Sequence, residues 1–344
     1  DIDRFISTLR TKSKEFNSIS NVQLASMLEE TITNINEVAY FWATICSDNK
    51  GTTKTPAEGE EWVGGPYAAV LATQYYRDTL IDDSDLNEDK YNEKENSYSV
   101  FPNNLIERIS FPFVNAKVLF NKSMSFEDIN KYRGFSKRYD IDPSITLVLG
   151  AGNYSSIPYL DVMYHLVTRR SVILLKLNPV NEYLKPVFEK VFQNFIERGY
   201  IIVTTGNLDE SKYMTKHPGV NHIHLTGSDK TYEDIVYGRE LSVNDKKVKQ
   251  LQKINNKPIT SELGNVTPII IHPGKWSTSD IKYQARKIVT GKLNNNGFNC
   301  ISAQVVVLPD GWGHTDTLIK YIKHYMNKIK DRKAYYPDLS LIHI

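Results

Sequence analysis

Residues 145–153, Ile-Thr-Leu-Val-Leu-Gly-Ala-Gly-Asn, give the strongest indication of the fold. This stretch is a short apolar run rich in β-branched residues, and it ends in a glycine-rich turn. Three similar runs follow at 171–175, 200–204 and 222–225, separated by segments of helical length and periodicity. Short strands that alternate with helices are typical of βαβ units. We therefore predict an α/β fold built on a parallel sheet.

The regions on either side of this core have different patterns. Apolar residues recur at three- and four-residue steps over 23–45, which predicts an amphipathic helix that includes Cys46 in the core, and a second helix is expected over 67–81. The acidic, asparagine-rich stretch 82–99 is expected to be a loop. A lysine-rich connector at 238–257 precedes a further strand, helix and strand at 268–271, 280–292 and 304–308. We place a domain boundary in this connector.

Composition excludes several classes of partner. The 344 residues carry 42 basic and 40 acidic side chains, a formal net charge of +2, so no long-range field favours nucleic acid or an anionic membrane. No apolar run is long enough to span a bilayer. Two cysteines do not make a disulfide framework, which fits a reducing compartment such as the cytosol or an organelle matrix. The chain starts at Asp1 rather than Met, which leaves a targeting segment open.

Polar side chains end or directly follow three of the expected strands. Gly150-Ala151-Gly152-Asn153 comes after the first strand, Lys176 ends the second, and Thr226-Gly227-Ser228 follows a later one. Parallel α/β sheets bind ligands at the carboxyl ends of their strands, where helix N-termini can hold phosphate. Taken singly, Asn153 could stabilise a turn and Lys176 could extend from a strand end to solvent.

A thiol and a carboxylate stand in distinctive surroundings further on. Cys300 ends the run Asn294-Asn295-Asn296-Gly297-Phe298-Asn299-Cys300, and Glu262 lies in Ser261-Glu262-Leu263-Gly264-Asn265. A free cysteine is usually a small buried hydrophobe, and a lone glutamate can cap a segment. Together, a thiol and a carboxylate suit covalent catalysis with a general base.

These fragments, in this order, resemble the aldehyde dehydrogenase superfamily between about residues 145 and 309. The resemblance rests on Asn153, Lys176, Thr226-Gly227-Ser228, Glu262-Leu263-Gly264, and Gly297 three residues before Cys300. It implies a Rossmann-like domain that binds NAD or NADP over 141–257. It also implies an N-terminal helical part over 1–140 and the start of an α/β catalytic domain over 258–344.

The resemblance implies oxidation of a small-molecule aldehyde to a carboxylic acid. Cys300 would attack the aldehyde, Asn153 and the backbone N–H of Cys300 would hold the oxyanion, and Glu262 would act as the base that hydrolyses the thioester. Cofactor contacts would come from Lys176, Gly227, Ser228, Gly150 and Gly264, and Gly297 would allow the tight backbone that presents Cys300. A dimer or tetramer is expected if the chain is full length.

Several positions depart from the family pattern. Pro179 stands where a ribose-binding glutamate is common, which predicts that NADP is tolerated as well as NAD. Tyr232 replaces a common glycine, and Asn265 and Val266 replace glycine and lysine. Phe298 replaces a glutamine two residues before the nucleophile, which favours an aromatic or aliphatic aldehyde. Only 44 residues follow Cys300, so we expect the catalytic domain to be incomplete.

Two other functions share these residues. One is a non-catalytic relative that serves as a structural component of a larger assembly, favoured by the short C-terminal part and the altered cofactor contacts. The other is an acyl-CoA or acyl-phosphate reductase, which uses the same thioester in reverse. No metal is expected, because His222 and His224 alternate on one strand without a third ligand nearby.

Overall fold

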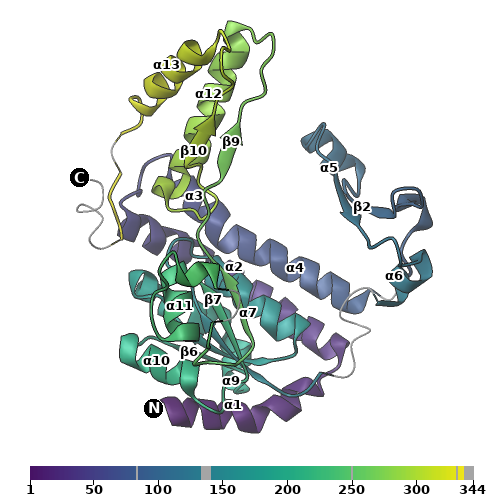
Figure 1. Cartoon of the computed structure of the whole chain (residues 1–344). Coiled ribbons are helices and arrows are strands. Elements are labelled where there is room, and N and C mark those ends of the chain that lie inside the picture. The colour runs from purple at the N-terminus through teal and green to yellow at the C-terminus, as the bar shows by residue number, and fades with distance from the viewer. Residues whose placement is uncertain (83, 133–140, 249–250, 331, 337–344) are drawn as a thin grey trace.

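A five-stranded parallel sheet forms the centre of the computed structural model, which describes residues 1–82, 84–132, 141–248, 251–330 and 332–336 (Figure 1). Its strands are β4 (Ile145–Leu149), β5 (Val172–Lys176), β6 (Ile201–Thr204), β7 (His222–Thr226) and β8 (Ile259–Glu262). They lie in the order β6-β5-β4-β7-β8. The predicted α/β fold and parallel sheet are confirmed.

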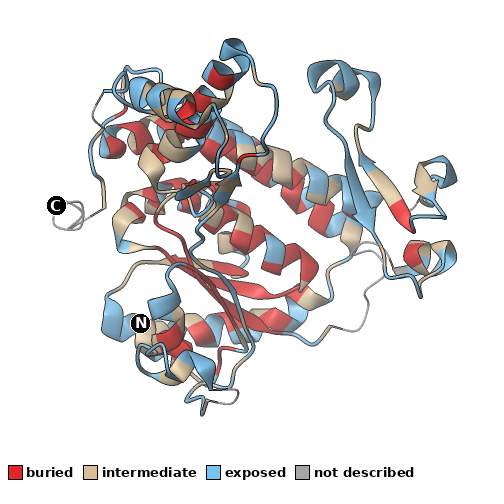
Figure 2. Ribbon diagram, turned by 45° about the horizontal axis from the view of Figure 1, so that its top comes forward, coloured by how far each residue is buried: buried red, intermediate tan, exposed pale blue. Residues whose placement is uncertain are grey.

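Helices cover this sheet and connect its strands. The connecting helices are α7 (Ile157–Thr168), α8 (Lys185–Val191), α9 (Gln193–Glu197), α10 (Leu208–Lys216) and α11 (Asp229–Tyr237). All five residues of both β4 and β5 are buried, as expected for strands covered on both faces. Figure 2 shows this buried sheet between its covering helices.

Helices make up most of the first 81 residues, and the helices predicted over 23–45 and 67–81 are confirmed. The helices of this region are α1 (Ile2–Asn17), α2 (Asn21–Lys50), α3 (Glu58–Trp62) and α4 (Ala68–Ile81). Ser20 and Gln23 form a capping box that starts α2, and Gly51 with φ 69° ends it. The buried side chains of α2 include Trp42 and Cys46, so the predicted core position of Cys46 is confirmed.

A small lobe follows α4 and stands apart from the central sheet in Figure 1. It contains β1 (Tyr91–Asn92), β2 (Ser97–Phe101), α5 (Leu105–Ser110), β3 (Ala116–Leu119) and α6 (Phe126–Tyr132). The stretch 82–99 was expected to be a loop, and this is wrong for β1 and the start of β2. These two strands pair with each other, and β2 also pairs with β3. The lobe exposes several large apolar side chains, among them Ile106 and Phe113.

A second, smaller core lies beyond the sheet. It is formed by β9 (Pro268–Ile270), α12 (Thr278–Leu293), β10 (Val305–Val307) and α13 (Thr315–Met326). The two strands are parallel, with Ile269 opposite Val306. Strand β8 comes after the expected domain boundary at residue 257 but is hydrogen-bonded to β7 of the central sheet. The division of the chain at that residue stays a prediction.

Within the described residues, no helix is both long and apolar enough to cross a membrane. The same part of the chain brings no three His, Cys, Asp or Glu side chains together in a way that could hold a metal ion.

Candidate active site

The carboxyl ends of four neighbouring strands bring the expected site residues to one edge of the sheet. Lys176 at the end of β5 is in register with Leu149 at the end of β4, and Thr226 at the end of β7 is in register with Glu262 at the end of β8. The backbone N–H of Gly150 donates to Lys176 O at 3.0 Å, and that of Gly227 donates to Glu262 O at 3.0 Å. The sheet thereby sets these groups side by side.

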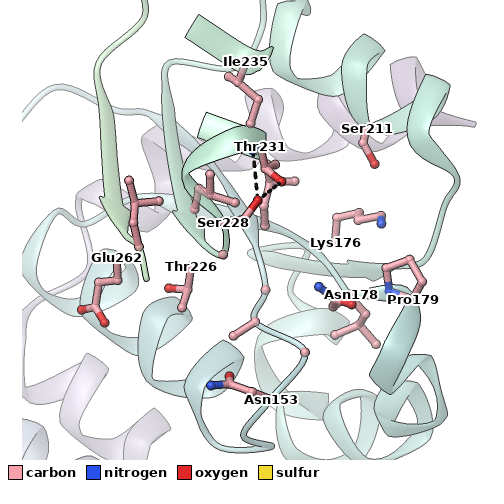
Figure 3. A pocket seen from close by; sticks show the side chains of 18 of the residues that line it. Asn153, Lys176, Asn178, Pro179, Ser211, Thr226, Ser228, Thr231, Ile235 and Glu262 are labelled. Atoms are coloured by element: carbon pink, nitrogen blue, oxygen red, sulfur yellow. Dashed lines mark hydrogen bonds between the residues drawn. The ribbon is translucent and has the colours of Figure 1, made fainter. Parts of the chain in front are cut away.

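The order of the strands reverses between β4 and β7. From β4 the chain proceeds to β5 and β6 on one side, and then crosses to β7 and β8 on the other. Open α/β sheets bind ligands in the crevice outside such a switch point. A cleft of about 640 Å³ lies there, and Asn153, Lys176, Glu262 and Cys300 all line it. Figure 3 shows Glu262 and Thr226 on one side of the view and Lys176, Asn178 and Pro179 on the other.

Cys300 is exposed in the loop that follows α12. Asn295, Asn296 and Gly297 before it all have positive φ angles, at 49°, 56° and 78°. Asparagine and glycine are the residues that tolerate this left-handed conformation best. A Cβ on Gly297 would also meet Lys292 O at 3.2 Å, so the tight backbone that the sequence predicted at Gly297 is confirmed.

The Asn153 side chain reaches this nucleophile loop. Its amide Nδ2 donates to Phe298 O at 2.9 Å, and its Oδ1 accepts from the backbone N–H of Tyr154 at 2.9 Å. An amide group has two N–H donors. The second N–H of Asn153 has no acceptor among the described residues. Asn153 is one of the residues that line the cleft. Asn153 therefore retains one donor that a ligand could use.

Lys176 presents a buried cation at the other end of the cleft. The residue is 7% exposed, and its ammonium forms no hydrogen bond or ion pair with any described residue. Burial lowers the pKa of Lys176, an effect that the carboxylates of Glu182 and Glu210 partly offset. An ammonium that faces the cleft on a largely buried side chain, with little access to water and no partner, costs free energy unless a ligand binds it. Lys176 is thus suited to hold a polar group of a nucleotide.

The other expected cofactor contacts also line the cleft. Ser228 caps α11, where its Oγ accepts from the backbone N–H of Thr231 at 3.1 Å (Figure 3). Gly150 lies close to α7, because a Cβ there would meet Pro158 at 3.1 Å. Gly227 and Gly264 also border the cleft. A helix N-terminus, open glycine backbone and an unpaired lysine are what a dinucleotide requires, so these residues fit NAD or NADP.

A buried polar cluster supports the floor of the cleft beneath Thr226. The Thr226 hydroxyl donates to Asp161 at 2.9 Å and is hydrogen-bonded to His224 Nε2 at 3.3 Å. His224 Nδ1 is hydrogen-bonded to the Thr260 hydroxyl at 2.8 Å, and Nε2 lies 3.3 Å from Asp161. His224 thus fixes the orientation of Thr226. The local sequence gives no signal at Asp161, because its partners lie on a strand far along the chain.

Several further residues contact the site without a signal in the sequence. Lys50 and Glu61 form a buried ion pair beneath Asn153, with Nζ 3.0 Å from the carboxylate. Tyr336 lines the cleft and packs on Phe298, with ring centroids 5.1 Å apart. Tyr232, which stands where the family commonly has glycine, packs against the main core and does not line the cleft.

A model of the aldehyde dehydrogenase family matches residues 163–339, just over half of the chain. The chain belongs to the aldehyde dehydrogenase family. The match includes Lys176, Glu262 and Cys300, whereas Asn153 lies before it. The family membership that the sequence motifs indicated is thereby confirmed.

Among curated proteins, the chain is similar to N-succinylglutamate 5-semialdehyde dehydrogenase of Sphingopyxis alaskensis. The two are 23% identical over 183 residues, which is 53% of this chain and 34% of the relative. The chain therefore spans about a third of that relative's length.

Solved structures of aldehyde dehydrogenases share the fold. Aldehyde dehydrogenase 21 of Physcomitrella patens, in complex with succinate, has a TM-score of 0.63 at 12% identity and covers 96% of this chain and 56% of its own. Aldehyde dehydrogenase C of Pseudomonas syringae, in complex with NAD⁺ and octanal, has a TM-score of 0.62 at 13% identity. The match covers 96% of this chain and 54% of that structure. Betaine aldehyde dehydrogenase of Staphylococcus aureus, in complex with NAD⁺, has a TM-score of 0.62 at 14% identity. The match covers 96% of this chain and 54% of that structure. The chain spans slightly more than half of these structures, which carry a nicotinamide cofactor in two of the three cases.

Proposed function

We propose that this chain carries the cofactor site and the nucleophile of an NAD(P)-dependent enzyme that oxidises an aldehyde to a carboxylic acid. The observation that supports it most directly is that Cys300, Glu262 and Asn153 line one cleft together with Lys176. A thiol, a carboxylate and an amide donor in one cleft are the groups that covalent aldehyde oxidation requires. A homo-oligomer and a reducing compartment remain parts of this proposal.

The first step is attack by the Cys300 thiolate on the carbonyl carbon of the aldehyde. A carbon–sulfur bond forms and the carbonyl oxygen becomes an oxyanion in a thiohemiacetal. The free N–H of Asn153 and the backbone N–H of Cys300 would hold this oxyanion. Preorganised donors of this kind contribute about 3 kcal/mol each to transition-state stabilisation.

The second step leaves an acyl group on the sulfur of Cys300. A bound nicotinamide supplies the hydride acceptor for this oxidation. Glu262 then takes a proton from water, the resulting hydroxide attacks the thioester, and the carbon–sulfur bond breaks to release the carboxylic acid. Glu262 is exposed at the cleft, where water can reach it.

The cofactor site is proposed to accept NADP as well as NAD. Pro179 lines the cleft near Lys176 and brings no carboxylate that would repel a 2′-phosphate (Figure 3). The carboxylate of Glu210 is engaged in the cap of α10, where it accepts from the backbone N–H of Asn207 at 2.8 Å. The unpaired ammonium of Lys176 favours either ribose hydroxyls or a phosphate.

Replacement of the nucleophile tests the proposal. Cys300→Ala should abolish the aldehyde-dependent reduction of NAD or NADP, followed at 340 nm with benzaldehyde and hexanal, because no other exposed thiol is available. Cys46→Ala is the matched control and should retain turnover, since Cys46 is fully buried and burial raises the pKa of its thiol to about 12. Undiminished turnover in Cys300→Ala would exclude the covalent mechanism.

A further inference from the structure

Lys50 is a buried cation with partners in three separate parts of the chain. It ends α2 and is 4% exposed. Its ammonium lies 3.0 Å from both carboxylate oxygens of Glu61, and it donates to Asn153 O at 3.2 Å and to Asn295 Oδ1 at 3.0 Å. The cation therefore joins the N-terminal helices, the turn after β4 and the nucleophile loop.

Asn295 completes this connection from the side of the nucleophile loop. It is 3% exposed, and its amide donates to Asn153 O at 2.9 Å and to Asn299 Oδ1 at 3.1 Å. Its backbone N–H donates to Glu60 Oε2 at 2.9 Å. Its side-chain oxygen also accepts from the Tyr335 hydroxyl at 3.2 Å. Both polar atoms of the Asn295 side chain are thus engaged. One of its bonds holds the backbone of Asn153, and another holds Asn299, the residue before Cys300.

Stability alone does not account for the ion pair. A buried pair often contributes no more than well-packed apolar side chains of similar volume, because both charges lose their hydration. Buried charges can instead fix one arrangement of the groups they touch. In this structure the groups touched are the Asn153 carbonyl and Asn295, five residues before Cys300.

We propose that Lys50 and Asn295 are positioning residues that hold the Asn153 peptide and the nucleophile loop in register, so that the Asn153 amide and Cys300 face the same substrate carbonyl. The proposal rests on the proposed function. Lys50 and Asn295 both donate to Asn153 O, and the Asn153 amide in turn donates to Phe298 O at 2.9 Å in the nucleophile loop. Loss of these bonds would let the oxyanion donor and the thiol move apart. A displacement of about 1 Å can reduce a rate about 10²-fold.

The adjacent asparagines provide a matched pair of variants. Asn295 and Asn296 both have a left-handed backbone, which glycine adopts without strain. The Asn296 amide donates only to Lys333 O, at 2.9 Å, away from Asn153. Asn295→Gly should lower kcat for benzaldehyde oxidation about 10²-fold with KM for the cofactor unchanged. Asn296→Gly should retain the wild-type kcat. Equal kcat values in the two variants would overturn the proposal.

A double variant separates positioning from folding stability. Lys50→Met/Glu61→Met replaces the ion pair by apolar side chains of similar size, which should keep Tm at or above that of the wild type. The proposal predicts that this stable variant still loses kcat about 10²-fold. A stable double variant with full kcat would show that the pair serves the fold alone.

Hydrogen exchange makes the test independent of turnover. If the wild-type chain oxidises no aldehyde, the proposed function fails. The positioning role is then tested by the rate of amide hydrogen exchange in residues 294–300. Their amides should exchange about tenfold faster in Asn295→Gly than in Asn296→Gly, while those of β4 and β5 remain unchanged. Identical exchange in the two variants would overturn the claim.

Discussion

At the level of single residues, Lys176 is expected to lower the stability of the fold and to strengthen cofactor binding. Burial lowers the pKa of its ammonium, and it has no partner among the described residues. Lys176→Met should therefore raise Tm and at the same time weaken cofactor binding. A charge-assisted hydrogen bond contributes about 1.5–3 kcal/mol, so Kd should rise at least about tenfold. The increase should be larger for NADP, because its 2′-phosphate adds negative charge.

Isothermal titration of the wild type and Lys176→Met with NAD and with NADP measures this effect. Lys185→Met on the surface of α8 is the control, since Lys185 only pairs with Glu189 at 3.4 Å on an exposed face. Wild-type affinity for both cofactors in Lys176→Met would contradict the assigned role. No binding of NADP to the wild type would contradict the expectation drawn from Pro179.

At the scale of elements, the packing of α7 on β7 contains a buried histidine that should make the fold sensitive to acid. His165 is 1% exposed, and neither ring nitrogen has a hydrogen-bond partner among the described residues. Burial, with repulsion from His224 and Arg169, lowers the pKa of His165 to about 3. An unfolded histidine has a pKa of about 6.5, so the unfolded chain binds more protons below that pH. The free energy of unfolding should therefore fall as pH decreases below 6.5.

Urea unfolding at pH 7.5 and pH 5.5 tests this expectation. The wild type should lose about 1 kcal/mol through His165 between these values. His165→Leu should lack this loss, whereas His272→Leu, at an exposed histidine, should retain it. The same loss in His165→Leu as in the wild type would contradict the account.

The elements that the sequence predicted best are those with strong periodicity. The helix expected over 23–45 is the centre of α2, and the strand expected over 145–149 matches β4 in both bounds. Strands β1 and β2 were missed because β1 has only two residues and pairs only with β2, and β2 is held in turn by β3, which lies beyond an intervening helix. A weak local pattern cannot reveal a strand whose stability comes from a distant partner.

At the scale of the whole molecule, the sequence predicted the residues that line the cleft but not what holds them. Asn153 follows a predicted strand and Lys176 ends another, so their shared edge could be inferred from the order of the elements. No strand was predicted at β8, which places Glu262 at the same edge. The contact of Lys50 with Asn295 joins residues 245 positions apart. Nothing in the local sequence distinguishes this buried lysine from the exposed lysines of other helices. Such contacts require the folded structure.

We propose that Cys300 and Glu262 act in sequence on one substrate within the cleft. Intact mass spectrometry of Glu262→Gln, after incubation with NAD or NADP and benzaldehyde or hexanal, tests it most directly. We expect a covalent acyl adduct on Cys300 that persists in this variant, is absent from Glu262→Gln/Cys300→Ala, and is cleared rapidly in the wild type. Absence of any adduct in Glu262→Gln while the wild type turns over would contradict hydrolysis through Glu262. Rapid release of the adduct by coenzyme A would instead favour acyl transfer to a thiol.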